Sequence, residues 1–142
     1  MELQDAFDAQ LDLQIKNFGQ DPRGLDEEKK VEYLTWNVLA SLDELHEALA
    51  EFGWKPWASS KHVNRDAVIS ELVDLLHFQM NMLISLDCDA REFLAKYFEK
   101  RGINAKRQDE GYDGVTGKCP SCKRALDDVA VHCTTDKCAS WE

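Results

Sequence analysis

The stretch Glu44-Leu45-His46-Glu47 and its counterpart Glu71-Leu72-Val73-Asp74 decide the fold that we expect for this chain. Each stretch holds two acidic residues three positions apart, inside an apolar pattern typical of a helix. Residues three apart share one face of a helix, with about 5–6 Å between their Cβ atoms. The 23 residues between the pairs suit two antiparallel helices joined by a loop, which would bring four carboxylates into one small volume.

Four carboxylates at close range call for a cation. Like charges raise one another's pKa unless a positive ion lies among them. Ligands that are all oxygen atoms favour Mg²⁺ or Mn²⁺, ions that commonly serve phosphate chemistry. Two solvated helix faces would carry the same residues. That alternative is stronger for Glu44 and Glu47 than for Glu71 and Asp74, which lie in a helix that we expect to be buried.

Composition excludes some classes of function. The chain has 142 residues, of which 44% are hydrophobic, and a formal net charge of −10. This charge argues against nonspecific binding of nucleic acids or anionic membranes, because their phosphates would be repelled. No apolar run reaches the roughly 18 residues that span a bilayer, and the start of the chain does not resemble a signal peptide. We therefore expect a cytoplasmic protein of one domain with room for a small appendage, in which the cysteines are thiols or metal ligands.

The apolar periodicity predicts helices along most of the chain. The helices are expected over residues 2–18, 26–52, 65–86 and 90–101. Gly102 is expected to close the last helix, before a loop-like or extended stretch over residues 103–117. The third helix is apolar nearly all round, which predicts that it is buried. Its narrow polar stripe, which includes Glu71, Asp74 and His77, would then need a metal, a ligand or basic side chains as a partner.

Several amide side chains are candidates for ligand contacts. Gln14 and Asn17 stand near the end of the first helix, and their amides offer donors and acceptors that suit a pyrimidine base. Exposed polar residues without any role would look the same. Asn81 is either a neutral oxygen ligand or phosphate contact, or a satisfied amide of the core. We interpret His77 as a core histidine rather than a metal ligand.

Cationic and aromatic residues add further candidates. Lys100, Asn104 and Arg107 could donate hydrogen bonds to phosphate oxygens, or form a solvated basic patch. Trp57, in the loop after the second helix, could border a base or sugar, or cover the core. Lys55 in the same loop could contact phosphate or be exposed.

The end of the chain has a different character. Its cysteines form a C-x₂-C-x₁₀-C-x₄-C pattern made by Cys119, Cys122, Cys133 and Cys138. Closely spaced cysteine pairs in a short polar segment favour a tetrahedral Zn²⁺ site, and the metal would supply the stability that a small core cannot. We predict a helical domain over residues 1–112, a linker over 113–117 and a zinc ribbon over 118–142. Cys88 is predicted to be an ordinary half-buried thiol, and His132 could replace one cysteine ligand.

Taken in order, these motifs resemble the all-α nucleoside triphosphate pyrophosphohydrolases, which include the MazG proteins and the dimeric dUTPases. The closer resemblance is to short, phage-type dimeric dUTPases, and it covers about residues 4–112. Its segments are Leu13 to Asn17, Glu44 to Glu47, Phe52 to Trp57, Glu71 to Phe78 and Lys100 to Tyr112. The acid motif alone specifies only the superfamily, whereas the ordered set is more specific. Lys106 departs from the apolar or aromatic residue expected there, and the zinc ribbon is not a usual part of this fold.

The resemblance implies an all-α fold, a bundle of four to five helices, and a homodimer that cleaves dUTP to dUMP and diphosphate. It implies Mg²⁺ on the catalytic carboxylates Glu44, Glu47, Glu71 and Asp74. It also implies base contacts from Gln14 and Asn17, a place for Trp57 near the nucleoside, and phosphate contacts from Lys55, Lys100, Asn104 and Arg107.

Two alternatives to a dUTPase stay open. A sister enzyme could act on dCTP or a modified deoxynucleotide, because a side-chain amide that flips exchanges its donor and acceptor. A protein of another class, a non-catalytic binding module, could use the zinc ribbon to dock a partner and the acid pairs as structure alone. The sequence does not name such a partner.

Overall fold

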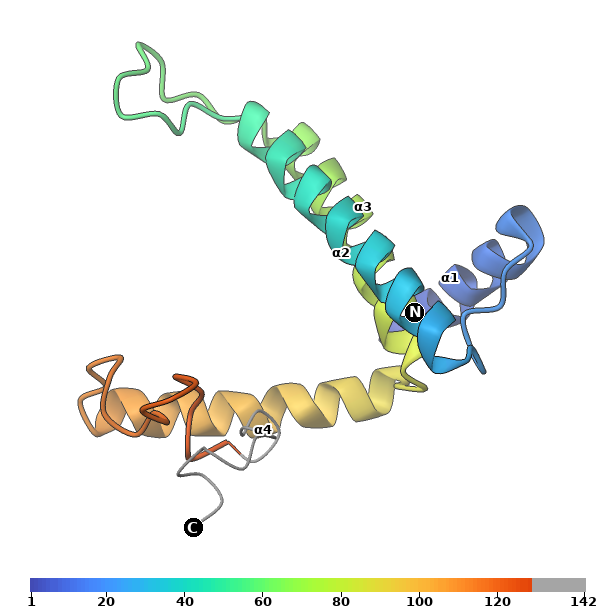
Figure 1. Ribbon diagram of the computed structural model, residues 1–142. Coiled ribbons are helices and arrows are strands. Elements are labelled where there is room, and N and C mark those ends of the chain that lie inside the picture. The colour runs from blue at the N-terminus through green and yellow to red at the C-terminus, as the bar shows by residue number, and fades with distance from the viewer. Residues whose placement is uncertain (129–142) are drawn as a thin grey trace. The chain divides into compact units, whose positions relative to one another are not determined.

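The computed structural model describes residues 1–128, so Cys133, Cys138 and His132 lie outside the described residues. Its helices are α1 (Leu3–Phe18), α2 (Glu27–Ala50), α3 (Arg65–Ser85) and α4 (Ala90–Asp109), shown in Figure 1. Within residues 1–128 there is no β-strand, only isolated bridges such as that between Phe52 and Val63. The all-α prediction is confirmed, and every helix begins within one residue of its predicted start.

Helix α2 begins where a local hydrogen bond favours it. The Asp26 side chain accepts a hydrogen bond from the backbone N–H of Lys29 at 2.9 Å. This bond satisfies one of the amide groups left without a partner in the first turn of a helix. The same bond lowers the pKa of Asp26, so the cap is held in its charged form.

A tight loop joins α2 to α3 and turns the chain back on itself. The backbone N–H of Gly53 donates to the carbonyl of His62 at 2.9 Å, and the N–H of Asn64 donates to that of Glu51 at 2.9 Å. A Cβ atom at Gly53 would lie 2.0 Å from the Ser60 carbonyl oxygen, so only glycine fits. The loop therefore sets α2 and α3 side by side and antiparallel, as Figure 1 shows.

Helix α1 packs against the end of α3 that lies farthest from this loop. Phe7 from α1 is buried among Met80, Ile84 and Ala90. The backbone N–H of Ala90 donates to the side-chain oxygen of Gln4 at 3.2 Å, which adds a polar contact to the apolar one. The core of the described chain is therefore concentrated at one end of the α2–α3 hairpin.

The prediction that α3 is buried is wrong for the single chain. Leu72 and Val73 are each 47% exposed, and Ile69 and Leu76 are also exposed. The reason is that, among residues 1–128, this part of α3 packs mainly against α2, which leaves its other apolar faces in contact with solvent. By length and composition α3 could also cross a membrane, with a mean hydropathy of 1.3, although the core helix of a soluble protein would pass the same test. One helix of this kind is weak evidence for a membrane span, and Glu71 and Asp74 interrupt its apolar sequence.

Helix α4 does not end at Gly102, as was predicted, but continues to Asp109. A glycine inside a helix is about 1 kcal/mol less favourable than alanine, and the strong helix formers on both sides outweigh one such residue. The chain leaves the helix at Gly111, whose φ of 78° lies in the left-handed region that favours glycine. The stretch 103–109, predicted as loop or extended, is therefore helical.

The chain divides into two compact units, Met1–Phe93 and Leu94–Glu142. The first contains α1, α2, α3 and the first turn of α4. In the second, a short bridged turn follows α4, in which the N–H of Cys119 donates to the carbonyl of Arg124 at 2.8 Å. Each unit is described by itself below.

Candidate functional site

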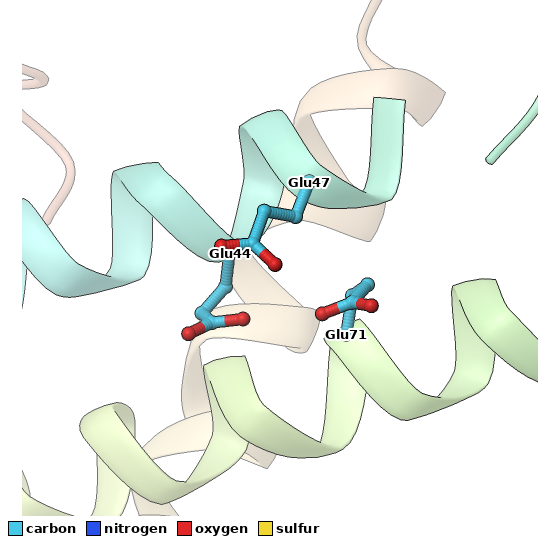
Figure 2. Close-up of side chains that lie close together, drawn as sticks. All are labelled: Glu44, Glu47 and Glu71. Atoms are coloured by element: carbon cyan, nitrogen blue, oxygen red, sulfur yellow. The ribbon is translucent and has the colours of Figure 1, made fainter. Parts of the chain in front are cut away.

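Three of the predicted acidic ligands meet between α2 and α3. One carboxylate oxygen from each of Glu44, Glu47 and Glu71 lies within 4.8 Å of the others, and we call these residues the acid cluster. Figure 2 shows their side chains converging on the space between the two helices. The i, i+3 spacing turns both α2 acids toward α3, so the predicted meeting of the two pairs is observed for these residues.

The electrostatics of the acid cluster are unfavourable without a cation. Burial, and after it the negative charges of the neighbouring acids, raise the pKa of Glu44 above its ordinary value. The direction means that the site favours the neutral form of this group. A set of carboxylate oxygens with this property fits a hard divalent cation, which would remove the repulsion.

Asp74 lies beside the acid cluster and has a partner of its own. Its Oδ1 atom lies 3.3 Å from Nδ1 of His77, one turn further along α3. Its charge contributes to the raised pKa of Glu44, so it is close enough to act on the cluster. His77 therefore contacts a candidate ligand, which its interpretation as a core histidine did not anticipate.

A cavity of about 650 Å³ lies further along the same pair of helices. Aromatic side chains form much of its wall, contributed by Phe18, Tyr33, Trp36 and Phe78. Polar groups from all three helices of the first unit also line it, namely Gln14, Asn37 and Asn81. An aromatic wall with a few polar groups is typical of a site for a flat, polar ring.

The cavity and the acid cluster are related by simple helix geometry. On α2 Glu44 follows Asn37 by seven residues, and on the antiparallel α3 Asp74 precedes Asn81 by seven. Seven residues correspond to two turns, or roughly 10 Å along the axis. Both helices therefore present the polar wall of the cavity and the carboxylates on nearly the same face, two turns apart. A ligand seated in the cavity could extend a chain toward the acids.

A line of hydrogen-bonded, buried amides lies next to the cavity, and two of its members, Asn37 and Asn81, line it. Nδ2 of Asn37 donates to the Tyr33 carbonyl at 2.8 Å, and Nδ2 of Asn81 donates to Oδ1 of Asn37 at 2.9 Å. Nε2 of Gln10 donates in turn to Oδ1 of Asn81 at 2.7 Å. Asn81 is therefore a satisfied core amide that also lines the cavity. Sequence reasoning missed Tyr33 and Asn37, although their i, i+4 spacing on α2 was available as a signal.

Gln14 lines this cavity, whereas the other predicted ligand contacts in the first unit lie away from it. Asn17 is exposed and is not among the lining residues. Lys55 and Trp57 lie in the α2–α3 loop, where Trp57 is 79% exposed. The Lys55 ammonium lies 5.9 Å from the centre of the Trp54 ring, so its described neighbour is an aromatic face.

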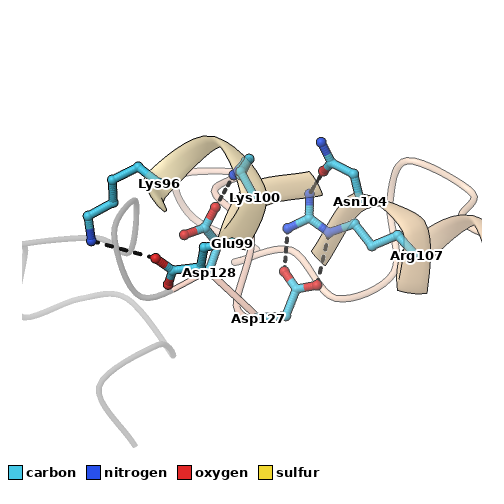
Figure 3. A network of polar contacts seen from close by, with 7 residues as sticks. All are labelled: Lys96, Glu99, Lys100, Asn104, Arg107, Asp127 and Asp128. Carbon is cyan, nitrogen blue, oxygen red and sulfur yellow. Dashed lines mark hydrogen bonds and ion pairs between the residues drawn. The ribbon is translucent and has the colours of Figure 1, made fainter. Parts of the chain in front are cut away.

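The predicted phosphate contacts on α4 already have acidic partners. Lys100 pairs with Asp128, and Nε of Arg107 donates to Oδ2 of Asp127 at 2.9 Å, as Figure 3 shows. The bond with Arg107 lowers the pKa of Asp127, and the same bond raises the pKa of Arg107. Oδ1 of Asn104 accepts a hydrogen bond from Arg107 at 3.4 Å. In the described part of the second unit, the carboxylates of Asp127 and Asp128 therefore contact the side chains that were predicted to bind phosphate.

Half of the predicted zinc site is within the described residues. Cys119 is buried, and Cys122 packs against it. The turn between them is closed by a hydrogen bond from the N–H of Lys123 to the carbonyl of Cys119, at 2.9 Å. Two thiols on one short turn suit a shared metal ion. The other predicted ligands, Cys133 and Cys138, fall outside the described residues.

A two-helix hairpin that gathers carboxylates beside an aromatic cavity fits the all-α nucleoside triphosphate pyrophosphohydrolases, the superfamily that the acid motif indicates. Comparison with known proteins is more specific. The dUTPase family matches residues 1–96, so this chain belongs to that family. The resemblance to phage-type dimeric dUTPases is thereby confirmed, and the match ends before Lys100 and the cysteine segment.

Curated relatives come from phages. The chain is 34% identical to the dCTP pyrophosphatase of Enterobacteria phage T4 over an alignment of 89 residues, and the match covers 53% of this chain and 52% of that protein. It is 35% identical to the dCTP pyrophosphatase of Enterobacteria phage LZ5 over an alignment of 71 residues, and the match covers 42% of this chain and 41% of that protein. The chain thus spans about half the length of these relatives. No solved structure matches it.

Proposed function

We propose that this protein is a divalent-cation-dependent pyrophosphohydrolase of deoxynucleoside triphosphates, with dUTP as its main substrate. Membership of the dUTPase family supports this activity. The observation that carries it is the placement of an aromatic cavity and an acid cluster two turns apart on the same two helices. The base and sugar would occupy the cavity, and the phosphates would extend toward the carboxylates.

The acidic residues would act as follows. Glu44, Glu47 and Glu71, with Asp74 beside them, would hold Mg²⁺ or Mn²⁺. When bound, such ions neutralise phosphate charge and lower the pKa of a water molecule. A carboxylate of the cluster would accept a proton from the attacking water. The water oxygen would bond to a phosphorus atom of the triphosphate as the bond from that phosphorus to the oxygen bridging the first two phosphates breaks, and diphosphate would leave.

We also propose that the protein is a homodimer. The apolar stripe of α2 that does not face α3 includes Val38, Leu42 and Leu45, all of which are exposed in the single chain. Exposed residues of α3 extend this apolar surface. Contiguous apolar surface of this kind marks an interface, and a second copy is the partner that the family implies. Replacing Leu42 by Asp should yield monomers in light scattering, whereas Glu28→Lys on the same helix should not.

Cytosine nucleotides are the second candidate substrate class. Both curated relatives described above are named dCTP pyrophosphatases. Measuring kcat/KM for each dNTP with Mg²⁺ separates the candidates, with diphosphate release as the signal. Preference for dUTP supports the proposal, preference for dCTP transfers it to the sister activity, and hydrolysis of no nucleotide refutes it. The last result would favour a binding module in which the acid cluster is structural.

We further propose that Cys119, Cys122, Cys133 and Cys138 hold a structural Zn²⁺. The buried Cys119 and the partly buried Cys122 on one turn support half of this ligand set. A metal analysis of the purified protein should find one zinc per chain. The Cys119→Ser variant should lose it, whereas Cys88→Ser should keep it, because Cys88 lies outside the cysteine pattern.

A further inference from the structure

The hydrogen bonds around the cavity form a chain with only one possible direction. A backbone carbonyl can only accept, so Asn37, which bonds to the Tyr33 carbonyl, must present its nitrogen there. Its oxygen then faces Asn81, which must donate its nitrogen in turn. The same logic fixes Gln10, whose nitrogen donates to the Asn81 oxygen. These contacts tie together α1, α2 and α3 next to the cavity.

Gln14 and Tyr33 stand one turn away from members of this chain. Gln14 follows Gln10 by four residues on α1, and Tyr33 precedes Asn37 by four on α2. The Tyr33 hydroxyl donates to Oε1 of Gln14 at 3.1 Å. The Gln14 and Tyr33 side chains are 8% and 7% exposed, so water offers each of them little alternative. The backbone turns that carry both partners are therefore held by the amide chain.

We propose that Tyr33 is a positioning residue that turns the Gln14 amide so that its nitrogen faces the cavity, where it reads a hydrogen-bond acceptor on the base. For the identity of the ligand, a nucleotide base, this inference rests on the function proposed above. A phenol is a better donor than acceptor, and its buried hydroxyl requires a partner. If the Gln14 amide were reversed, its NH₂ group would face the hydroxyl, and the Tyr33 proton would lose its acceptor.

The protonation state of Tyr33 is consistent with this role. Burial raises the pKa of Tyr33 to about 12, so the hydroxyl keeps its proton throughout the working range of pH. It therefore remains a donor, and the amide oxygen of Gln14 remains the acceptor. The two hydrogens on Nε2 of Gln14 are left for a ligand.

The orientation has a consequence for the choice between pyrimidines. Uracil presents a donor at ring position 3 and an acceptor at position 4, and cytosine presents the reverse. A fixed amide nitrogen therefore favours whichever base places its acceptor against Gln14. An amide that is free to flip would serve both bases, because flipping exchanges donor and acceptor. Tyr33 would thus set the discrimination between dUTP and dCTP that a glutamine alone cannot provide.

The test is the Tyr33→Phe variant, which removes only the hydroxyl, with Tyr97→Phe as the matched control on an exposed tyrosine. We expect the ratio of kcat/KM for dUTP and dCTP to move toward one by roughly 3- to 10-fold, the effect of one neutral hydrogen bond. The change should lie in KM for the preferred base, with kcat within about twofold, because the acid cluster is untouched. An unchanged ratio in a folded variant overturns the proposal.

A second measurement does not depend on turnover. In protein labelled with ¹⁵N-glutamine, Tyr33→Phe should shift or broaden the side-chain NH₂ signals of Gln14, and Tyr97→Phe should not. If wild type hydrolyses no dNTP but this change is seen, the proposed function fails while the positioning by Tyr33 stands. If the Gln14 signals are identical in the two variants, the positioning role is refuted whatever the substrate.

Discussion

The acid cluster between α2 and α3 consists of negative charges that repel one another. The basic residues of α4 are positive charges that are already paired with carboxylates. Glu44, Glu47 and Glu71 approach one another, and burial together with the neighbouring negative charges raises the pKa of Glu44. Lys100 and Arg107 are instead neutralised within their own unit, by Asp128 and Asp127. One group of charges needs an ion from outside the chain, whereas the other has already found its counter-ions.

This difference teaches how the two groups would respond to a triphosphate. Cations bound at the acid cluster turn a repulsive site into one that attracts phosphate oxygens. The α4 residues would bind phosphate in competition with the carboxylates that they already hold. The acid cluster should therefore dominate catalysis, and the α4 residues should modulate affinity. The largest effect of a substitution is therefore expected at the acid cluster, and the smallest at α4.

Removing one acid should abolish most of the activity. Glu47→Gln is expected to lower kcat/KM for the best dNTP by at least about 100-fold, the upper range for groups that merely support a metal ligand. Asp43→Asn, an exposed acid next to Glu44, is the matched control and should stay near wild type. Rates of diphosphate release measure both. Equal activity of wild type and Glu47→Gln would show that the cluster is not the catalytic site.

The acid cluster should make the stability of the fold decrease as the pH rises, and Mg²⁺ should oppose this decrease. The pKa of Glu44 is raised in the folded state above 4.5, so the folded protein binds this proton more tightly than the unfolded chain. The proton on Glu44 therefore contributes to the stability of the fold at pH values below the pKa of the unfolded chain. This contribution is lost as the pH rises through the raised pKa of the folded state. Above that window Mg²⁺ should increase Tm, and the increase should grow with pH.

Melting curves with Mg²⁺ or a chelator, recorded across this range of pH, measure the effect. Glu44→Gln should flatten the pH dependence of the Mg²⁺-induced change in Tm, because no proton competes with the metal at that position. A pH profile unchanged by this substitution would contradict the assignment of the effect to Glu44.

The smallest effect is expected at α4. Replacing both Asp127 and Asp128 by Asn would free Lys100 and Arg107, and should tighten the binding of inorganic diphosphate. Because solvent screens an ion pair with at least one exposed partner, as in both of these pairs, we expect at most about a fivefold change in Kd by calorimetry. Glu99→Gln, which removes the partner of Lys96 on the same helix, is the control. Weaker binding in the double variant would show that the aspartates do not compete with phosphate.

The features that the sequence predicted well are those set by neighbours in the chain. Helix starts follow from caps such as Asp26, and the convergence of Glu44 and Glu47 follows from their spacing on one helix. Gly102 was misjudged because a single glycine does not end a helix whose flanks favour it, whereas the left-handed Gly111 does. The burial of α3 was misjudged because the apolar composition of a helix does not determine how much of its surface the other helices of the chain cover.

What the sequence determined by itself is therefore the set of helices and the chemistry that they carry, because both depend on residues within a turn or two of each other. Tertiary structure alone decided how that chemistry is arranged. Tyr33 and Asn37 acquire their place at the cavity through contacts with Gln14 and Asn81, and the Asn37–Asn81 bond joins residues 44 positions apart. The pairing of Arg107 with Asp127 spans 20 positions and follows from no local pattern. Such contacts depend on how whole helices and turns pack, which the residues adjacent in sequence do not specify.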